Sequence, residues 1–161
     1  MSDAALDCRI AGDEQERLAY FALRRSIFCA EQGLFMGDDR DGVDDAAVPI
    51  VCVLSGRGVV GVVRIWEETP GEWWGGRLGV DAAHRTMGAI GRRLVQTAVG
   101  TARAWGALRF RATVQLANVP FFRRLRWQTL EPVDLHGQPH HLMQADLAAY
   151  PPIFAGNQHA A

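Results

Sequence analysis

Residues 77–94, RLGVDAAHRTMGAIGRRL, decide the fold expected for this chain. Apolar residues come first, a short polar loop follows, and glycines open a helical pattern from Gly88. The first turn of a helix carries unpaired N–H groups and the positive end of the helix dipole, so such a junction favours a phosphate. Arg85, Arg92 and Arg93 would add positive charge and forked hydrogen bonds beside it.

Two other phosphate-binding motifs do not fit this stretch. No Gly-Lys-Ser/Thr follows the glycines, which excludes a Walker loop, and the Gly-x-Gly-x-x-Gly pattern of dinucleotide-binding folds is absent. The glycines also fit an ordinary strand-to-helix turn with solvated arginines. The residues alone leave that plain alternative open.

The flanking sequence predicts strands and helices around one central sheet. Helices are expected over 13–32, where Gly33 is the stop, from Gly88 to Gly106, and over 119–125. Strands are expected over 48–54, 59–66, 73–80, 108–114, 129–135 and 141–147. The apolar face of the first helix is expected to carry Leu18, Phe21, Ala22, Ile27 and Phe28. The chain is read as one α/β domain over 1–161, with a core over about 8–150 and a short irregular tail.

The composition excludes several classes of function. A net charge of −1 gives no bulk attraction to nucleic acid or to an anionic membrane, and no run approaches the roughly 20 apolar residues that span a bilayer. All 17 basic residues are arginine, which excludes Schiff-base chemistry on lysine. Cys8, Cys29 and Cys52 are odd in number and lack metal-ligand spacing. They predict reduced, buried thiols in a cytoplasmic protein.

Residues 77–94 resemble the acetyl-CoA segment of the GNAT acyltransferases, Arg/Gln-x-x-Gly-x-Gly/Ala. Arg85-Thr86-Met87-Gly88 fits that pattern, whereas Ile90 stands at the second small position and Gly91 follows one residue later. Residues 118–127, NVPFFRRLRW, are similar to the family's Asn…Phe-Tyr-x-x-Leu-Gly-Phe segment.

Two finer resemblances concern subgroups of that family. Residues 23–33 and the acidic loop over 37–45 are similar to autoinducer-synthase-like members. The combination of 73–78 (WWGGRL), Val114-Gln115 and 137–141 (GQPHH) resembles more closely the nitrogen-starvation acetyltransferases encoded beside nitrilase genes.

The resemblance implies a mixed, mostly antiparallel sheet of about six or seven strands flanked by helices. It also implies a splay between the fourth and fifth strands that admits acetyl-CoA as acyl donor, with no metal. Backbone groups of Leu78, Gly79 and Val80 would bond the pantetheine arm, and Asn118 and Phe122 would lie beside the cofactor. The pyrophosphate would be held by a set of amides and arginines: Arg85, Met87, Gly88, Ala89, Ile90, Gly91, Arg92 and Arg93.

The resemblance implies direct attack of an amine on the thioester, with the N–H of Val80 as oxyanion donor. Phe122 stands where many relatives have the tyrosine that protonates the thiolate, so water or another group serves, or the thiolate leaves unprotonated. Glu31 is the first choice for a base or amine-binding carboxylate, ahead of His141. The other carboxylates considered are Glu67, Glu68 and Glu72.

Other chemistry-bearing residues receive plainer interpretations. In a strand, His140 and His141 point to opposite faces, so one would face an acceptor pocket and the other solvent. The acidic loop could attract a cationic amine or bind a cation, but it fails the EF-hand spacing and is interpreted as a solvated loop. His84 is expected to shape the loop before the pyrophosphate, and the five tryptophans to serve core or interface.

The leading function is transfer of an acetyl group from acetyl-CoA to the amine of a small metabolite. One alternative is longer-chain N-acylation, which the autoinducer-synthase resemblance motivates. The other is a non-catalytic CoA-binding sensor or subunit, which Phe122 motivates. No nucleic-acid or membrane partner is expected, and a homodimer is compatible with the resemblance.

Overall fold

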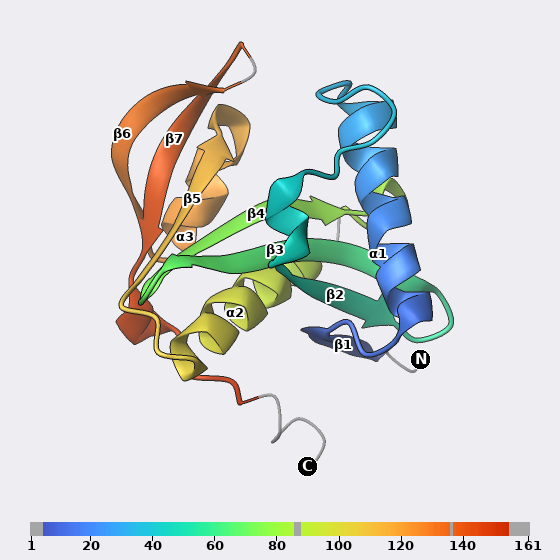
Figure 1. Ribbon diagram of the computed structural model, residues 1–161, viewed down its shortest axis with the longest axis horizontal. Helices are drawn as coiled ribbons and strands as arrows, with labels where there is room; N and C mark the ends of the chain where they lie inside the picture. The colour runs from blue at the N-terminus through green and yellow to red at the C-terminus, as the bar shows by residue number, and fades with distance from the viewer. Residues whose placement is uncertain (1–4, 86–87, 136, 155–161) are drawn as a thin grey trace. The chain divides into compact units, whose positions relative to one another are not determined.

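The computed structural model describes residues 5–85, 88–135 and 137–154. Figure 1 shows the order of its helices and strands along the chain. The strands are β1 (Leu6–Ile10), β2 (Val48–Leu54), β3 (Gly58–Thr69), β4 (Glu72–Val80), β5 (Arg109–Gln115), β6 (Trp127–Leu135) and β7 (Gln138–Ala145). The α-helices are α1 (Glu14–Arg25), α2 (Gly88–Ala104) and α3 (Val119–Arg124). A π-helical turn (Ser26–Glu31) and four 3-10 turns complete the chain: Gly42–Asp45, Ala82–His84, Leu116–Asn118 and Leu147–Ala149.

The strands form one mixed seven-stranded sheet in the order β1-β2-β3-β4-β5-β7-β6. The pairs β1–β2, β2–β3, β5–β7 and β6–β7 are antiparallel, whereas β4 and β5 run parallel. The predicted sheet and its mostly antiparallel character are therefore confirmed. The recorded β4–β5 register comprises Glu72–Trp74 against Arg109–Arg111.

The chain divides into two compact units, each described here by itself. Unit 1 comprises residues 1–66 and 77–98, and unit 2 comprises 67–76 and 99–161. The predicted single domain, and the predicted splay of the fourth from the fifth strand, stay predictions, since both concern how these units meet.

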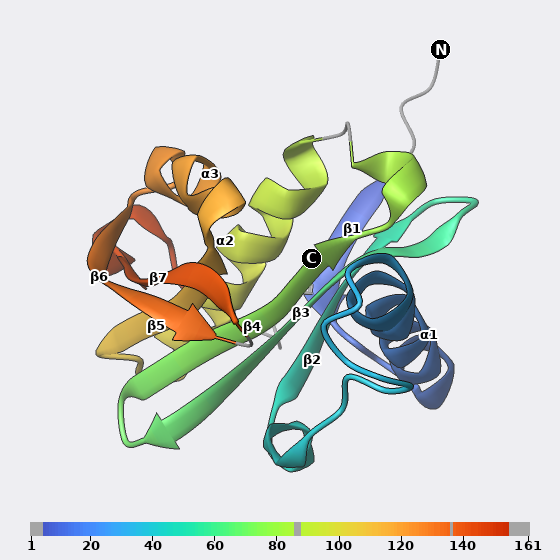
Figure 2. The same ribbon diagram turned by 90° about the horizontal axis from the view of Figure 1, so that it is seen from above.

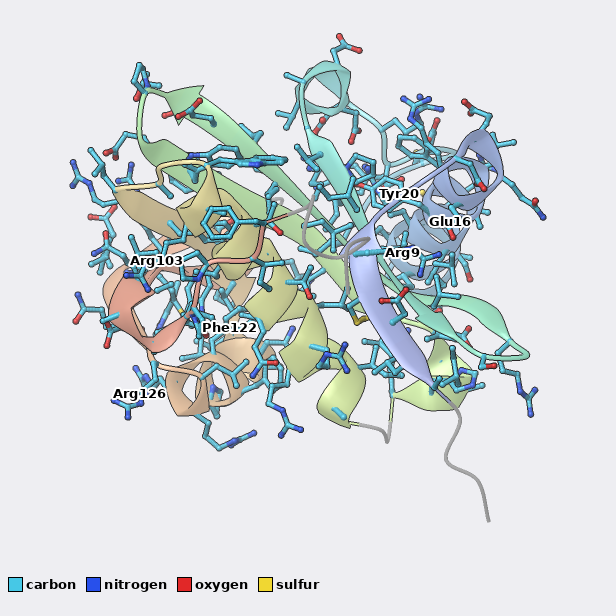
Figure 3. The ribbon with its side chains drawn as sticks, turned by 90° about the horizontal axis from the view of Figure 1, so that it is seen from below. Arg9, Glu16, Tyr20, Arg103, Phe122 and Arg126 are labelled. Atoms are coloured by element: carbon cyan, nitrogen blue, oxygen red, sulfur yellow. A yellow bond between two sulfur atoms is a disulfide. The ribbon has the colours of Figure 1, made fainter. Side chains whose placement is uncertain are left out.

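In unit 1, α1 covers one face of β2 and β3. Asp13 caps the helix by accepting a hydrogen bond from the Glu16 N–H at 2.8 Å. Tyr20 and Phe21 pack in a buried cluster with Val51 and Val62 of the two strands. A contact between Arg9 of β1 and Glu16 ties the first strand to the same helix (Figure 3).

The apolar face predicted for α1 is correct only in part. Phe21, Ile27 and Phe28 are buried, but Leu18 is 62% exposed and Ala22 is exposed. The buried face consists instead of Tyr20, Phe21, Arg24, Ile27 and Phe28, which recur at ordinary helical spacing, and Leu18 and Ala22 lie off that face. The helix ends in a π-helical turn over Ser26–Glu31, in which the Gln32 N–H donates to the Ile27 carbonyl at 3.0 Å. The helical stretch ends before Gly33, which has φ +64, as predicted.

The first half of α2 covers the opposite face of unit 1, as Figure 2 shows. Alternation along a strand turns Cys52 of β2 and Gly61 of β3 toward this helix. A Cβ on Gly61 would stand 2.8 Å from Leu94 and 2.9 Å from Ile90. Glycine at this position lets the helix approach the sheet closely. Leu94, Val95 and the further apolar residues predicted for this helix face are buried.

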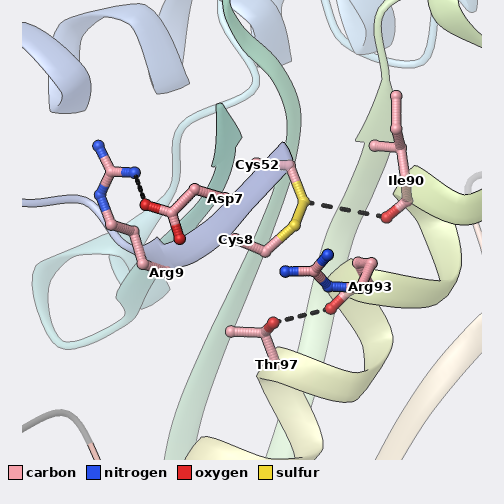
Figure 4. The surroundings of a disulfide bond; sticks show 7 residues. All are labelled: Asp7, Cys8, Arg9, Cys52, Ile90, Arg93 and Thr97. Atoms are coloured by element: carbon pink, nitrogen blue, oxygen red, sulfur yellow. Dashed lines mark hydrogen bonds and ion pairs between the residues drawn. A yellow bond between two sulfur atoms is a disulfide. The ribbon is translucent and has the colours of Figure 1, made fainter. Parts of the chain in front are cut away.

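Two sequence-based expectations fail at the first strand. β1 was not predicted, because Leu6–Ile10 is short and only Cys8 in it is buried. Cys8 lies opposite Cys52 in the β1–β2 register, with the Cα atoms 4.0 Å apart, and the two form a disulfide (Figure 4). The prediction of reduced thiols is therefore wrong for this pair, and Cys29 alone of the three is a free thiol. Without β1, a separation of 44 residues gave no sign of the pairing.

Unit 2 holds β5, β7 and β6 with α3 and the end of α2. Trp127 packs edge-on against Phe110 and Phe122, with ring centroids 5.7 Å and 5.0 Å away. The Trp127 indole N–H donates to the Tyr150 hydroxyl at 3.1 Å, and that hydroxyl donates to the Leu125 carbonyl. β6 begins two residues earlier than predicted and β7 three residues earlier. Among the described residues, no helix is long and apolar enough to cross a membrane.

Candidate functional site

The junction between β4 and α2 lies in unit 1 and has the predicted strand, loop and helix. The Asp81 N–H donates to the Val60 carbonyl at 2.8 Å, so the chain leaves β4 while still attached to β3. His84 closes the short turn: its N–H donates to the Asp81 carbonyl and its ring nitrogen contacts the Asp81 carboxylate, both at 2.8 Å. His84 therefore shapes this loop, as the sequence suggested.

Arg85 brings Glu31 to the end of β4. Its Nε donates to the Val80 carbonyl at 3.0 Å, and its guanidinium contacts the Glu31 carboxylate. The Arg85 and Glu31 side chains are 47% and 31% exposed, so solvent reaches both. Three residues singled out from the sequence, 54 positions apart at most, thus lie together.

The first turn of α2 is open to solvent at the positions that the phosphate hypothesis uses. Gly88, Ala89 and Arg92 are exposed, and a Cβ on Gly88 would meet nothing within 4 Å. Gly91 and Arg93 are half-buried. Thr86 and Met87 lie outside the described residues, so the Met87 prediction has no structural counterpart.

Ile90 departs from the small residue that the motif would place there, and the structure gives the reason. Its side chain is fully buried and lies against Gly61 of β3. Burial of the side chain does not move the backbone, so the N–H of Ile90 still belongs to the first turn of α2.

The strand end that would hold the pantetheine is closely packed on one side. Leu78 and Val80 are half-buried, whereas Gly79 is buried. A Cβ on Gly79 would stand 2.6 Å from Ile27 Cδ1. Only glycine lets the π-helical turn approach β4 this closely.

Sequence reasoning missed a network of buried charges in unit 1. Arg24 of α1 donates from Nε to the Asp39 carboxylate at 2.7 Å, and from both terminal nitrogens to Asp44 at 2.6 and 3.1 Å. Burial alone would lower the pKa of Arg24, but the hydrogen bonds to Asp44 and Asp39 raise it above its usual value. Burial opposes ionisation of Asp44, yet the hydrogen bonds from Arg24 and the Asp41 backbone hold the Asp44 pKa at about 2.

Two further arginines complete this network. Arg64 of β3 grips the Asp41 carboxylate with two nitrogens, at 2.7 and 3.1 Å, and lowers the pKa of Asp41. Arg77 of β4 donates from Nε to the Asp39 carboxylate at 3.0 Å. The interpretation of 37–45 as a solvated loop is therefore wrong for Asp39 and Asp44, which are buried in ion pairs. Ion pairs between segments 15 to 38 residues apart leave no local pattern to find.

No cluster of His, Cys, Asp or Glu in the described part of the chain could hold a metal.

The remaining predicted residues belong to unit 2. Asn118 is exposed at the start of α3, and its side chain makes no capping hydrogen bond. Phe122, labelled in Figure 3, is 6% exposed and packs on Trp127. The His141 Nδ1 lies 2.9 Å from the Thr129 hydroxyl, and the ring is half-buried. His140 is 7% exposed, with Nδ1 2.9 Å from the Gln138 carbonyl, so the expectation that one of the pair is solvated is wrong.

The alternative carboxylates have structural partners or simple exposure. The Glu67 carboxylate accepts from the Gly71 N–H at 2.9 Å within the turn that follows β3. Glu72 pairs with Arg109 at 3.1 Å and Arg111 at 2.9 Å. Glu68 is exposed. Burial raises the pKa of both tyrosines, Tyr20 and Tyr150.

Comparison with known proteins gives the fold a context. The structure resembles a Lactobacillus plantarum protein described as an N-acetyltransferase, with a TM-score of 0.78 and 23% identity over 91% of this chain and 99% of that one. An acyl-CoA N-acyltransferase of Pseudomonas aeruginosa has a TM-score of 0.69 and 18% identity, covering 88% and 99% of the two chains. A CoA-dependent acyl-homoserine lactone synthase, BjaI, has a TM-score of 0.72 and 18% identity, covering 89% and 83%. At these identities the likeness establishes the fold alone.

Sequence comparison adds the family. No curated protein matches the sequence closely enough to count as a relative. The family model for the acetyltransferase (GNAT) family matches residues 13–126, which is more than half of the chain and includes the whole β4–α2 junction. With its fold and its sequence in agreement, the chain belongs to the acetyltransferase (GNAT) family.

Proposed function

We propose that this protein transfers an acetyl group from acetyl-CoA to the amine of a small metabolite. The observation that carries the proposal is the β4–α2 junction, where Arg85 reaches from the loop to the Val80 carbonyl beside an open helix entrance at Gly88. That arrangement places an exposed guanidinium and the exposed first turn of a helix at one end of a strand, which suits an acidic cofactor.

The residues divide the work of binding. Backbone groups of Leu78, Gly79 and Val80 bond the pantetheine arm, and Asn118 and Phe122 lie beside the cofactor. Amides in the helix entrance and the arginines around it hold the pyrophosphate: Arg85, Met87, Gly88, Ala89, Ile90, Gly91, Arg92 and Arg93. No metal takes part.

The chemistry is a direct transfer. The acceptor nitrogen forms a bond to the acetyl carbon, the carbon–sulfur bond breaks, and the nitrogen loses a proton to a base. The Val80 N–H stabilises the oxyanion. Glu31 is the proposed base or amine-binding carboxylate, and His141 is the second choice. Phe122 cannot protonate the departing thiolate, so water does so or the thiolate leaves as the anion.

Arg85 links the two halves of this proposal. Its contact with Glu31 places a negative charge beside the guanidinium that would meet the pyrophosphate. A phosphate bound at Arg85 competes for that guanidinium, because opposite charges at this exposed site share its donors. Binding of acetyl-CoA would thereby release Glu31 toward the acceptor.

Titration calorimetry with acetyl-CoA tests the proposal. Wild type is expected to bind, with an affinity on the order of 1 μM to 1 mM. Gly88→Glu should weaken binding at least tenfold, because it places a carboxylate at the helix entrance, and Gly88→Gln separates the effect of size from that of charge. Gln96→Glu is the matched control, since it adds the same charge at an exposed position two turns further along α2. A folded wild type that does not bind acetyl-CoA would reject the proposal.

Longer-chain N-acylation is the second candidate, supported by the structural likeness to the acyl-homoserine lactone synthase. A series of acyl-CoA donors of increasing chain length decides between the two. Best turnover with long chains would replace the acetyl proposal.

A CoA-binding sensor or subunit remains the non-catalytic candidate, because Phe122 removes the usual proton donor. Tight CoA binding without turnover across a broad panel of amines would favour it.

Two finer assignments are also proposals. Within the family, residues 73–78 and 137–141 suggest the nitrogen-starvation acetyltransferases encoded beside nitrilase genes. If the protein acetylates only amines that are unrelated to nitrogen supply, the assignment to the nitrogen-starvation acetyltransferases is wrong. A homodimer is the proposed assembly, and sedimentation showing a monomer at micromolar concentration would remove it. The proposed location is the cytoplasm, although the Cys8–Cys52 disulfide withdraws the argument from reduced thiols.

A further inference from the structure

Arg77 has an unusual backbone conformation for its place in the fold. It lies in β4, three residues before the strand ends, yet its φ is +53. A side chain with a Cβ rarely takes this left-handed conformation, because the Cβ crowds the neighbouring carbonyl oxygen. Trp73, Gly75 and Gly79 are buried in alternation, and Arg77, which that alternation would bury fully, is only partly buried, with 15% of its side chain exposed. The strand therefore turns out of its regular path at this residue.

The side chain of Arg77 is fixed at its far end. Its Nε donates to the Asp39 carboxylate at 3.0 Å, and its NH2 donates to the Asp39 carbonyl at 2.8 Å. The same nitrogen lies 3.4 Å from the Asp41 carboxylate. The guanidinium also stands over the Phe35 ring, 4.3 Å from its centroid. These contacts hold the guanidinium in one place.

The partners of Arg77 are themselves anchored. Asp39 is fully buried and accepts from Arg24 of α1, and Asp41 is gripped by Arg64 of β3. The segment that receives Arg77 is thus fastened to two neighbouring elements of unit 1. An anchored partner can hold a strained backbone, which a free surface side chain cannot do.

We propose that Arg77 is a positioning residue for the acyl donor. Its guanidinium, held by Asp39 and Asp41, keeps residue 77 in the left-handed conformation, and this conformation sets the direction of the Leu78–Val80 backbone that follows. The inference rests on the proposed function, in which those three residues bond the pantetheine arm.

The bland alternative is that Arg77 merely neutralises the acidic segment. The two accounts differ in what glycine at this position does. Glycine takes positive φ without a steric penalty, whereas alanine and lysine, which have a Cβ, are destabilised by it. Backbone positioning predicts that Arg77→Gly is nearly normal while Arg77→Ala is not. Charge neutralisation predicts that both fail alike and that Arg77→Lys is normal.

The first readout needs no cofactor. Amide resonances of Gly79 and Val80, which are not bonded directly to residue 77, are compared by NMR between wild type and the three variants. The expected result is that Arg77→Gly keeps the wild-type shifts while Arg77→Ala and Arg77→Lys move them. Unmoved shifts in all three variants would overturn the inference whatever acetyl-CoA does. Arg77→Lys keeps a positive charge beside Asp39, so a folded variant is available if Arg77→Ala does not fold.

The second readout is acetyl-CoA affinity by calorimetry. Arg77→Gly should bind within about threefold of wild type, and Arg77→Ala and Arg77→Lys roughly tenfold more weakly, the ratio that an ordinary left-handed penalty implies. Equal affinities for the glycine and alanine variants would overturn the inference. Absence of binding by wild type would instead reject the proposed function and leave the NMR result standing.

Arg126 supplies a matched control. It also has positive φ, at +71, but follows α3 in unit 2. Arg126→Gly and Arg126→Ala repeat the same comparison away from β4. Neither change should alter acetyl-CoA affinity, and an equal effect there would show that the response at residue 77 is not local.

Discussion

Replacing Asp44 by asparagine tests the buried charge network directly. The Asp44 carboxylate accepts from both terminal nitrogens of Arg24, lies 3.1 Å from Arg64, and accepts from the Asp41 N–H at 3.0 Å. Its side chain is 6% exposed, so solvent screens these contacts little. Asparagine keeps the size of the side chain but, like a protonated aspartate, has no charge.

The magnitude follows from the Asp44 pKa. A fall from the ordinary 3.8 to about 2 stabilises the folded state by about 2.5 kcal/mol when the carboxylate is ionised. Because the folded pKa is the lower one, this stabilisation is complete above pH 3.8 and is lost as the pH falls through about 2. The difference in unfolding free energy between wild type and Asp44→Asn should therefore be about 2 kcal/mol larger at pH 7 than at pH 2.

Urea denaturation followed by tryptophan fluorescence at both pH values measures this difference. Asp45→Asn is the control, because Asp45 is exposed in the same 3-10 turn. It should change the unfolding free energy by less than about 0.5 kcal/mol at either pH. A wild-type advantage over Asp44→Asn that does not depend on pH would refute the reasoning, since it would not come from the ionised carboxylate.

Three further changes test other contacts of the fold. Gly79→Ala should cost about 1–3 kcal/mol of stability, because its Cβ would stand 2.6 Å from Ile27 Cδ1. Ile27→Val removes that atom and should recover part of the loss in the double variant; simple additivity in urea denaturation would contradict this. Thiol titration of the denatured protein should find Cys29 alone without reductant and all three cysteines after reduction, whereas three thiols in both samples would exclude the disulfide. Tyr150→Phe removes both hydrogen bonds of the buried Tyr150 side chain and should cost about 1–3 kcal/mol; an unchanged melting temperature would show that they contribute nothing.

Local patterns predicted most elements correctly. The glycine-opened helix from Gly88 and the hairpin around residues 55–58 combine clear periodicity with turn residues, and both are present. β1 lacked such a pattern, because a five-residue edge strand with one buried side chain has no periodicity to detect. The disulfide followed from β1 and was missed with it.

In the candidate site, too, the features set by local sequence were predictable and those set by packing of distant segments were not. The strand, loop and helix of the β4–α2 junction were predictable because the whole junction lies within 18 consecutive residues. The contact between Glu31 and Arg85, and the pairing of Asp39 with two arginines, depend on how distant segments pack. Clustered aspartates read along the chain look like a solvated loop, since the arginines that bury them come from α1, β3 and β4.

The π-helical turn at Ser26–Glu31 gives this fold an unusual route for evolutionary change. Such a turn contains one residue more than the α-helical turn it replaces. Loss of a single codon there would let the helix close to ordinary geometry while both of its ends stay attached. The residues on either side would keep their orientation, because only the extra residue is lost, whereas loss of a residue from the regular helix before it would rotate everything beyond by about 100° around the axis. A change of length at this turn can thus alter the side chains next to β4 without turning the rest of α1.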